Sequence, residues 1–372
     1  MFFCIETKMF QENLKNVMLA SNQKDASIPS ISCIKFDVDD YNSVKMTAYN
    51  LTVATEIIVK SEKSENGSVC INSKTLSDII FKCNNDFIEI SSDENDFCTI
   101  KSGKAKFQVS GLDSEQFPKL PLTGNVKNVS ADSDDLIVSA SDVIYAVAID
   151  DRKPIMRGVC LEFSNDIIDL VGCDGYRLAR RMISSNSQNN FKVTVPSETI
   201  DILNKILGHT EEKISMSYSR NFIVFNFNNG KITSRLLSGE YLDWKNIIPN
   251  DFSIYFEFNK RELTKSIEMS LTVQNNTKIN GSPLVFEFNP DTRFCKLSLK
   301  SVSGEFDDEV QIVTNGERKL KIAFNPKYLL EAIRHTSGDI VRFWVKESLS
   351  PAMVSNDKNF NDYNIILPVI TR

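Results

Sequence analysis

Two patterns of apolar and polar residues alternate along the chain. Six segments place apolar residues three and four positions apart, which is the spacing of an amphipathic helix. These segments are MFQENLKNVMLA from Met9, SKTLSDIIFKCN from Ser73, SDDLIVSASDVIYAVA from Ser133, PSETIDILNKILG from Pro196, NKRELTKSIEMSL from Asn259 and NPKYLLEAIRHTSG from Asn325. Between them lie shorter runs, such as NFIVFNFNNGKITSRLL, in which apolar and polar residues alternate around Gly and Asn turns. The chain therefore predicts six helices, each followed by antiparallel strands.

The helix segments recur at a nearly constant interval. Their starts lie ~60 to 65 residues apart, and such a period indicates a repeated supersecondary unit. A single one-helix unit cannot cover its own apolar face, whereas two units can enclose a core. The stretches GLDSEQFPKLP and LLSGEYLDWKNIIP share a Leu-x-x-Glu pattern and follow the second and the fourth helix, so they read as domain ends. We predict an α+β fold of three similar domains, each with two helices packed on antiparallel sheets, at residues 1–124, 125–251 and 252–372.

Start and stop signals support the helices independently of the period. The predicted N-caps, whose side chains would accept a hydrogen bond from a free backbone N–H, are Ser73, Ser133, Ser197, Asn259 and Asn325. Gly208 is expected to end the fourth helix, and Ser337-Gly338 the sixth.

One hairpin carries residues that a turn does not need. In LVGCDGYRLARRM, Leu170–Met182, the Asp174-Gly175 step between two alternating runs is a strong hairpin signal. The corresponding stretch of the first domain, MTAYNLTVATE, has Asn50 at the place of Asp174 and has neither the glycine, nor the aromatic residue, nor the arginine. A plain hairpin explains the Asp-Gly step, but it does not require Tyr176, Arg177 and Leu178 to follow. The second copy therefore carries residues beyond those that a hairpin needs.

Composition restricts the class of protein. With 372 residues, 41% of them hydrophobic and 25% charged, the chain is typical of a soluble globular protein of two or three domains. No run approaches the ~20 apolar residues of a membrane span, and Glu6 and Lys8 interrupt the apolar start, so we expect no anchor or signal peptide. The eight cysteines form no Cys-x-x-Cys pair, which argues against a zinc site or a disulfide framework and favours reduced thiols in the cytosol. We expect neither a metal nor a cofactor.

Two other functions receive little support. An enzyme is disfavoured because the two histidines, His209 and His335, lie near predicted helix ends, the carboxylates are scattered, and no nucleophile-elbow, Walker or His-Glu-x-x-His motif occurs. A sequence-specific DNA binder is disfavoured by the net charge of −6 and by the lack of a helix-turn-helix signal. A footprint confined to one DNA sequence would favour the second alternative.

Over its whole length the chain resembles the bacterial sliding clamps, the family of DNA polymerase III beta subunits. The resemblance is carried by Asp174-Gly175-Tyr176-Arg177-Leu178 and by the segments RKPIMRGVCLEF, SGKAKFQVSGLDSEQFPKL and NIILPVITR. It implies a head-to-tail homodimer whose six domains close a ring around double-stranded DNA, with helices lining the channel. It also implies, as partners, the polymerase III catalytic subunit, the clamp loader, and other polymerases and repair proteins with clamp-binding peptide motifs; no membrane is involved.

The resemblance places a partner-peptide groove between the second and third domains. Its apolar members would receive Leu and Phe side chains of the peptide, and Arg177 would orient the peptide. The groove would be lined by Met156, Cys173, Gly175, Tyr176, Arg177, Leu178, Leu242, Ile247, Leu367, Pro368 and Val369. Leu242 stands where proline is usual in the family and Cys173 where a small hydroxyl residue is common, and the end Ile370-Thr371-Arg372 also departs from the family, so the preferred peptide stays open.

Cations on or beside the predicted helices would face the DNA channel, because the apolar helix faces must meet the sheets. They are Lys8, Lys15, Lys74, Lys82, Arg152, Lys153, Lys205, Lys260, Arg261, Lys265, Lys327 and Arg334. The third helix instead opens with Asp132, Asp134 and Asp135, which would repel phosphate, so we expect weak and salt-sensitive DNA contacts.

The resemblance also implies which residues meet across the dimer. These are Phe107 from the first domain and Leu271, Thr272 and Val273 from the third. Thr272 is more polar than the aliphatic residue expected there, so we expect a weaker dimer than is usual.

Overall fold

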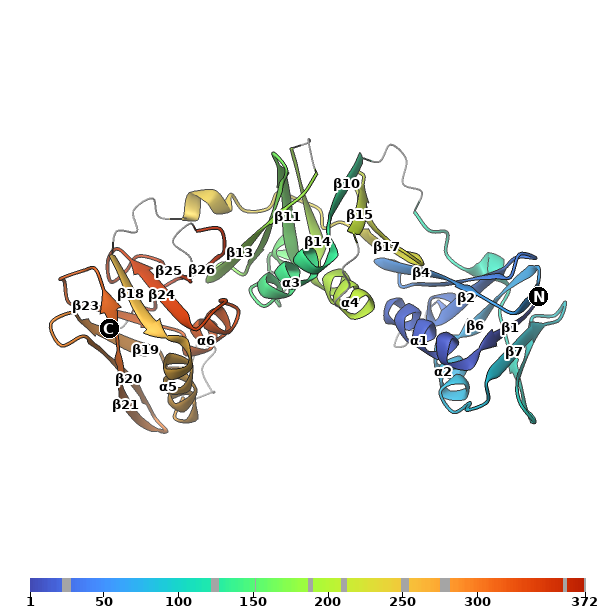
Figure 1. The fold of residues 1–372 in the computed structure, drawn as a ribbon, viewed down its shortest axis with the longest axis horizontal. Coiled ribbons are helices and arrows are strands. Elements are labelled where there is room, and N and C mark those ends of the chain that lie inside the picture. The colour runs from blue at the N-terminus through green and yellow to red at the C-terminus, as the bar shows by residue number, and fades with distance from the viewer. Residues whose placement is uncertain are drawn as a thin grey trace. The chain divides into compact units, whose positions relative to one another are not determined.

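A computed structural model of the chain has the fold drawn in Figure 1. The structure describes residues 1–21, 28–121, 127–150, 152–186, 190–208, 213–248, 254–274, 282–356 and 360–370. They form two compact units. The first holds residues 1–137, 185–187 and 198–236, and the second holds residues 138–184, 188–197 and 237–372.

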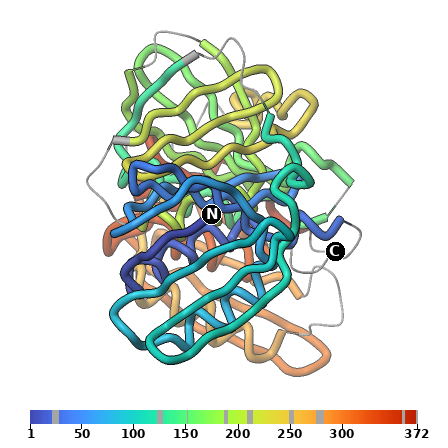
Figure 2. Tube along the Cα trace, turned by 90° about the vertical axis from the view of Figure 1, so that its right-hand side faces the viewer, coloured from blue at the N-terminus to red at the C-terminus, as the bar shows by residue number. Residues whose placement is uncertain are grey.

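The first unit is built on two antiparallel sheets. The five-stranded sheet has the order β5 (Lys63–Glu65), β1 (Phe2–Glu6), β7 (Phe87–Ser92), β8 (Phe97–Ser102) and β9 (Ala105–Ser110). The eight-stranded sheet has the order β10 (Lys127–Asp132), β15 (Lys213–Tyr218), β16 (Phe222–Phe227), β17 (Gly230–Arg235), β4 (Val53–Lys60), β3 (Ser43–Tyr49), β2 (Cys33–Val38) and β6 (Gly67–Asn72). Figure 2 shows the teal strands β7, β8 and β9 running side by side in this unit.

Helices α1 (Thr7–Val17) and α2 (Ser73–Ile80) belong to the first unit, as does α4 (Ser197–Leu207) from Glu198 onward. The apolar side of α1 is buried through Phe10 and Leu14. The ring of Phe10 lies 6.0 Å from that of Phe3 on β1 and 6.2 Å from that of Phe36 on β2. One helix therefore joins the two sheets around a single core, as the amphipathic pattern predicts.

The second unit repeats this plan. Its nine-stranded sheet has the order β14 (Phe191–Pro196), β11 (Gly158–Ser164), β12 (Ile167–Cys173), β13 (Arg177–Ser184), β26 (Tyr363–Ile366), β25 (Ala352–Ser355), β24 (Ile340–Val345), β18 (Ile254–Asn259) and β22 (Val313–Thr314). Its four-stranded sheet has the order β21 (Gly304–Gln311), β20 (Phe294–Ser301), β19 (Leu284–Asn289) and β23 (Leu320–Phe324).

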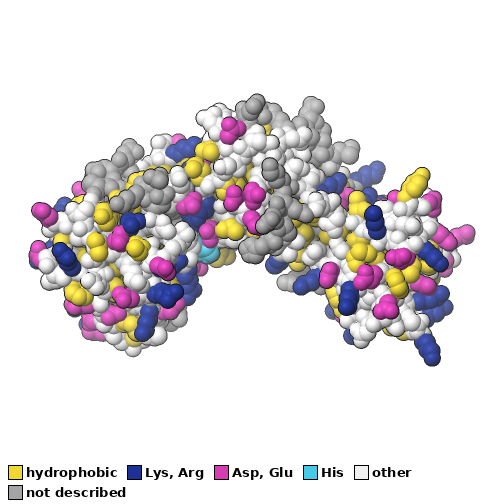
Figure 3. All heavy atoms as spheres, in the orientation of Figure 1, with side chains coloured by type: hydrophobic (Ala, Val, Ile, Leu, Met, Phe, Trp, Pro, Cys, Tyr) yellow, Lys and Arg dark blue, Asp and Glu magenta, His cyan; other side chains and the backbone are white. Residues whose placement is uncertain are grey.

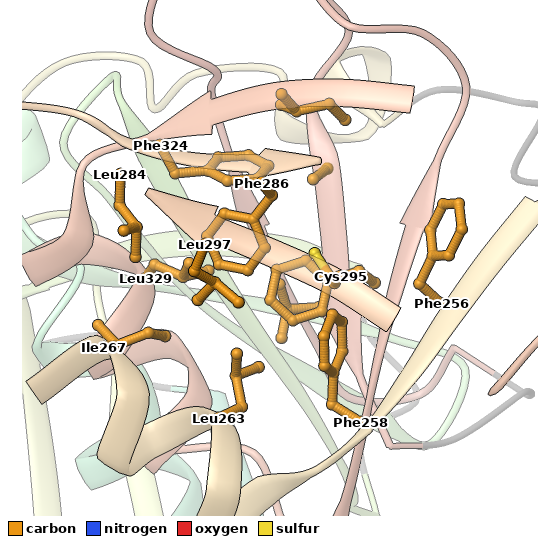
Figure 4. Close-up of a cluster of buried hydrophobic side chains, with 14 of the residues drawn as sticks. Phe256, Phe258, Leu263, Ile267, Leu284, Phe286, Cys295, Leu297, Phe324 and Leu329 are labelled. Atoms are coloured by element: carbon orange, nitrogen blue, oxygen red, sulfur yellow. The ribbon is translucent and has the colours of Figure 1, made fainter. Parts of the chain in front are cut away.

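Helices α5 (Lys260–Thr272) and α6 (Pro326–Arg334) pack on these sheets over a core rich in phenylalanine, and α3 (Ser133–Ile144) enters this unit at Val138. Figure 4 shows Leu263 and Ile267 of α5 directed toward Phe258, Phe286 and Leu297. The rings of Phe286 and Phe343 stack 5.8 Å apart, so neighbouring strands of different sheets are locked by aromatic contacts. Short 3-10 helices η1 to η5 lie at Met18–Ala20, Pro29–Ser32, Ser114–Gln116, Pro154–Arg157 and Trp244–Ile247.

All six predicted helices are present, but three of their predicted N-caps are wrong. Asn259 and Asn325 do accept hydrogen bonds from the first turns of α5 and α6. Ser73, Ser133 and Ser197 are instead the first helical residues, and the caps of α2 and α3 come one residue earlier, where Asn72 and Asp132 accept from backbone N–H groups. Asn and Asp are at least as good as Ser at this task, so the adjacent residue takes it.

Of the two predicted helix ends, the one at Gly208 is confirmed and the one at Ser337-Gly338 is wrong. Gly208 follows α4 with φ +55°, as expected of a glycine C-cap. Helix α6 stops at Arg334 with His335 as its cap, three residues before Gly338.

The sheets continue past the predicted domain boundaries. Strand β17 from the middle third pairs with β4 from the first third, and β13 pairs with β26 from the last third. The middle third thus contributes strands to the eight-stranded sheet of the first unit and to the nine-stranded sheet of the second unit. For this reason the chain divides into two compact units and not three. The boundaries at Gly124 and Asp251 lie outside the described residues and stay a prediction.

Three general features concern reactivity and location. All eight cysteines are free, and seven are buried. Among the described residues no group of His, Cys, Asp or Glu is arranged to hold a metal ion. In the same part of the chain, no helix combines the length and the apolar character needed to cross a bilayer.

Candidate partner-binding site

The Asp174-Gly175 step is a hairpin turn, as the sequence predicts. It joins β12 to β13, with Cys173 opposite Leu178. Asp174 Oδ1 accepts hydrogen bonds from the backbone N–H of Tyr176 at 2.8 Å and of Arg177 at 3.0 Å, and Gly175 has φ +91°. A glycine adopts this conformation without strain. The turn therefore presents the Tyr176 side chain, which is 49% exposed, at the tip.

The turn of the first domain has the same construction. It joins β3 to β4, and Asn50 Oδ1 accepts from the backbone N–H of Thr52 at 3.0 Å and of Val53 at 2.9 Å. Leu51, with φ +73°, occupies the place of Gly175. The duplication predicted from sequence thus reaches the level of individual hydrogen bonds, while the aromatic residue and the arginine belong to the second copy alone.

Arg177 lies inside the protein. Arg177 is 8% exposed. Its Nε donates a hydrogen bond to Asp174 Oδ2 at 3.0 Å, and its Nη2 donates to the carbonyl of Tyr145 at 2.7 Å. Its Nη1 donates to the Glu331 carboxylate on α6. Burial alone would lower the pKa of the guanidinium, but the hydrogen bond and charge of Glu331, with the charge of Asp174, raise it. The expected role in orienting a peptide is untested, and the visible role is to fix the turn against α6.

A pocket of about 510 Å³ opens beside the turn. It is lined by Val147, Ala148, Ile149, Asp150, Arg152, Lys153, Asp174, Gly175, Tyr176, Arg177 and Tyr328. Apolar and charged groups meet here: Ile149 is 91% exposed, and Arg152 pairs with Asp150 at 2.5 Å. The hydrogen bond from Arg152 lowers the pKa of the Asp150 carboxyl. The pocket can hold a short segment with apolar side chains and a few polar partners.

The other predicted groove residues fall into two groups. Met156, Cys173 and Leu178 are buried, with exposures of 5%, 3% and 2%, and none of them lines the pocket. Cys173, Leu178 and Leu242 share one apolar cluster with Trp244. Burial raises the pKa of the Cys173 thiol to about 11, so the thiol is neutral at neutral pH. The more accessible members are Leu242, Ile247, Leu367, Pro368 and Val369.

The end of the chain is tied to the turn. Leu367, which is 36% exposed, donates its backbone N–H to the carbonyl of Tyr176 at 3.0 Å, and Val369 donates to the carbonyl of Ala323 on β23 at 2.7 Å. These bonds bring Leu367 beside the tip of the turn. The residues Thr371 and Arg372 lie outside the described part of the chain.

Sequence reasoning missed the pocket residues between Val147 and Asp150, and Tyr328. Tyr328 is an aromatic residue beside the apolar face of α6, which buries Leu329, Leu330 and Ile333. In the sequence, Tyr328 is an aromatic residue that does not fall on the buried apolar face of its helix, and this position could have marked it as a candidate pocket residue. Arg152 and Lys153, expected in the DNA channel, line this pocket instead of a helix face.

Comparison with known proteins supports the same reading of the whole chain. Three sequence profiles match in order: the N-terminal domain of the DNA polymerase III beta subunit at residues 1–121, its central domain at 131–243 and its C-terminal domain at 245–370. The chain belongs to the family of DNA polymerase III beta subunits. A beta sliding clamp of Staphylococcus epidermidis is 25% identical over all of both chains, and that of Bacillus subtilis is 24% identical with the same coverage.

Solved beta-subunit structures have the same fold. The sliding clamp of Bacillus subtilis superposes with a TM-score of 0.93 at 24% identity and covers 100% of both chains. A Pseudomonas aeruginosa clamp that was solved bound to griselimycin also reaches 0.93, at 23% identity and with full coverage of both chains.

The basic side chains that were predicted to face the DNA channel are mostly exposed to solvent. Lys8, Lys15, Lys74, Lys82, Lys205, Arg261, Lys265, Lys327 and Arg334 are all exposed on the helices or at their ends. Acidic residues share these helices, and Arg334 pairs with Glu268 at 2.7 Å. Figure 3 shows basic and acidic side chains interspersed on the visible face. Lys260 differs because its ammonium donates to the backbone carbonyls of Arg334 and Thr336 at the end of α6.

The predicted dimer residues lie at two sheet edges. Phe107, 37% exposed, is on β9, an edge strand of the five-stranded sheet. Leu271 and Val273, at the end of α5, pack on the core beside β21, an edge strand of the four-stranded sheet. Thr272 is exposed, and its hydroxyl donates a hydrogen bond to the carbonyl of Met269 at 2.7 Å.

Proposed function

We propose that the pocket beside residues 174–177 binds short peptides of proteins that replicate and repair DNA. The protein is a sliding clamp, a processivity factor for DNA polymerase. The finer partners that we propose are the polymerase III catalytic subunit, the clamp loader and other polymerases and repair proteins, all docking through one peptide motif. The protein would act by tethering and not by catalysis, in the cytosol.

The observation that carries this proposal is the half-exposed Tyr176 lining a pocket, on a turn whose flanking residues Cys173 and Leu178 belong to a buried apolar cluster. Groups that stay apolar and accessible on a folded surface mark binding sites. Two or three apolar anchors would contribute about 1.5–3 kcal/mol each, and ordering the peptide offsets part of this. The net affinity should be near micromolar, about −8 kcal/mol. Partners of that affinity can exchange on one clamp.

We also propose a head-to-tail homodimer that encircles duplex DNA. Strand β9 ends the five-stranded sheet and β21 ends the four-stranded sheet, so joining them would give nine strands, like the sheet already present within the second unit. Edge strands present free N–H and C=O groups that favour such pairing. The exposed helix lysines would contact phosphates without reading bases, as sliding requires.

The test is a fluorescence anisotropy titration of a labelled Gln-Leu-Ser-Leu-Phe peptide against the full chain. We expect saturable micromolar binding. Tyr176→Ala should weaken it about 10- to 30-fold, because an aromatic residue at the centre of a small interface carries much of the binding energy. The substitution leaves the backbone bonds of the turn intact.

Tyr41→Ala is the matched control, since Tyr41 is 89% exposed and lies in the first unit. It should bind like the unmodified chain. Absence of saturable binding to the unmodified chain, or equal affinity in Tyr176→Ala, would rule out this pocket as the peptide site.

A further inference from the structure

A column of aromatic rings crosses the second unit from the pocket to the end of α6. The rings of Tyr176 and Tyr328 lie 6.4 Å apart, and the Arg177 guanidinium lies 4.4 Å from the ring of Tyr328. On the other side of Arg177, the ring of Tyr145 is 5.1 Å away, and it stacks on His335 at 4.7 Å with an angle of 6°. His335 is thus the far end of a continuous stack that begins at the pocket.

Hydrogen bonds fix the inner members of the column. The carbonyl of Tyr145 accepts from Arg177 at 2.7 Å, and its hydroxyl donates to Asn364 Oδ1 at 2.9 Å. Burial raises the pKa of Tyr145, so the hydroxyl stays protonated and keeps donating. Tyr145 therefore contacts Arg177 both through its backbone carbonyl and through its ring.

The outer end is held by charged groups from three elements. His335 Nδ1 lies 2.9 Å from Asp142 Oδ1 on α3, and Arg181 of β13 donates to the carbonyl of His335. The ammonium of Lys260, at the start of α5, donates to carbonyls on either side of His335. The imidazole is consequently held in place although a third of its side chain is exposed.

Capping helix α6 does not by itself require a ring at position 335. Helix α6 has already ended at Arg334, and His335 is not a member of the buried apolar core beneath the helix. A residue that only capped the helix would not need to stack on Tyr145. The ring contact is the feature that requires an explanation.

We propose that His335 is a positioning residue for the peptide pocket. Its ring, oriented by Asp142, supports Tyr145, and Tyr145 holds Arg177 through its carbonyl and its ring. Arg177 in turn packs on Tyr328 and fixes the turn that carries Tyr176. The inference rests on the proposed function of the pocket, and it adds a residue that does not touch the peptide.

The experiment compares His335→Ala and His335→Phe in the full chain, with the Gln-Leu-Ser-Leu-Phe titration. Alanine removes the stacked ring and should weaken binding about fivefold, a size typical of residues that act through others. Phenylalanine keeps the ring and should stay within about twofold of the unmodified chain, while Asp142 retains its contact with Arg181 at 3.4 Å.

Phe191→Ala is the matched control for loss of a stacked ring. Phe191 stacks on Phe163 at 4.0 Å and belongs to β14, an edge strand separated from β13 by β11 and β12. It should leave the peptide affinity unchanged even if thermal stability falls. Unchanged affinity in His335→Ala, or equal losses in the Ala and Phe variants at similar Tm, would overturn the proposal.

A second measurement separates this inference from the proposed function. Amide hydrogen exchange of Tyr176 and Arg177, whose N–H groups donate to Asp174, is followed without peptide. Exchange there should accelerate in His335→Ala and not in His335→Phe. If the unmodified chain binds no peptide, the proposed function fails, and the exchange result still decides whether His335 positions the turn.

Discussion

At the scale of residues, the main surprise is the direction of Arg177. Its neighbours in sequence predict a binding site, and both Tyr176 and Arg177 line the pocket. The guanidinium, however, turns inward to Asp174, Glu331 and Tyr145. Sequence gives the type of side chain but not its partner, because Glu331 and Tyr145 are distant in the chain. Only the fold brings the Glu331 carboxylate and the Tyr145 carbonyl within hydrogen-bond distance of Arg177.

Arg177→Ala should therefore destabilise the protein. Removing one member of a buried ion pair leaves its partners uncompensated and costs about 3 kcal/mol in the free energy of unfolding. Urea denaturation measures this. Arg152→Ala, which breaks the exposed pair with Asp150, should leave the urea midpoint nearly unchanged, because solvent screens an exposed ion pair. Similar stabilities for the two variants would contradict an internal role for Arg177.

At the scale of elements, the apolar periodicity predicted all six α-helices that the structure describes. It did not predict the residues at which they begin. The side chains of Asn72 and Asp132 compete with Ser73 and Ser133 for the same backbone N–H groups, and local sequence does not decide between adjacent capping residues. The hairpin turn at Asp174 was predictable because the Asp-Gly step is specific. Its counterpart at Asn50 was predictable only by comparison between the repeats, since Leu51 gives no turn signal.

The two equivalent turns allow an exchange experiment. Leu51 holds a φ of +73° that costs a branched residue about 1 kcal/mol or more, so Leu51→Gly should raise the free energy of unfolding by about 0.5 kcal/mol after the entropy of glycine is counted. Gly175→Leu should lower it by about 1 kcal/mol or more, although no atom lies within 4 Å of an added Cβ. Urea denaturation of both variants tests this. A destabilised Leu51→Gly would show that the Leu51 side chain outweighs backbone strain.

At the scale of the whole molecule, the repeat predicted three similar units but not how their sheets join. Strand β17 pairs with β4, and β13 pairs with β26, although the partners are far apart in the sequence. An alternating pattern predicts a strand but does not specify which distant strand it pairs with. The predicted dimer edges carry opposite charge. Lys104 and Lys106 lie at β9, whereas Glu305, Asp307, Asp308 and Glu309 lie on β21.

Closure of the proposed dimer should therefore depend on charge. Lys104→Glu combined with Lys106→Glu should raise the dimer dissociation constant at least about tenfold at low salt, because like charges would face each other across the new pair of strands. Sedimentation equilibrium measures this. Lys63→Glu, on the opposite edge strand β5, is the control and should leave the constant unchanged. Equal constants for the double variant and the unmodified chain would place the dimer contact elsewhere.

The shared sheets have a practical consequence for anyone who divides the gene. A fragment that ends with the first third would keep β4 and lose β17, and a fragment that begins with the last third would keep β26 and lose β13. Each piece would expose a freshly unpaired, largely buried strand to solvent, and such strands recruit copies of themselves. Truncated versions of this protein should accordingly precipitate or form inclusion bodies.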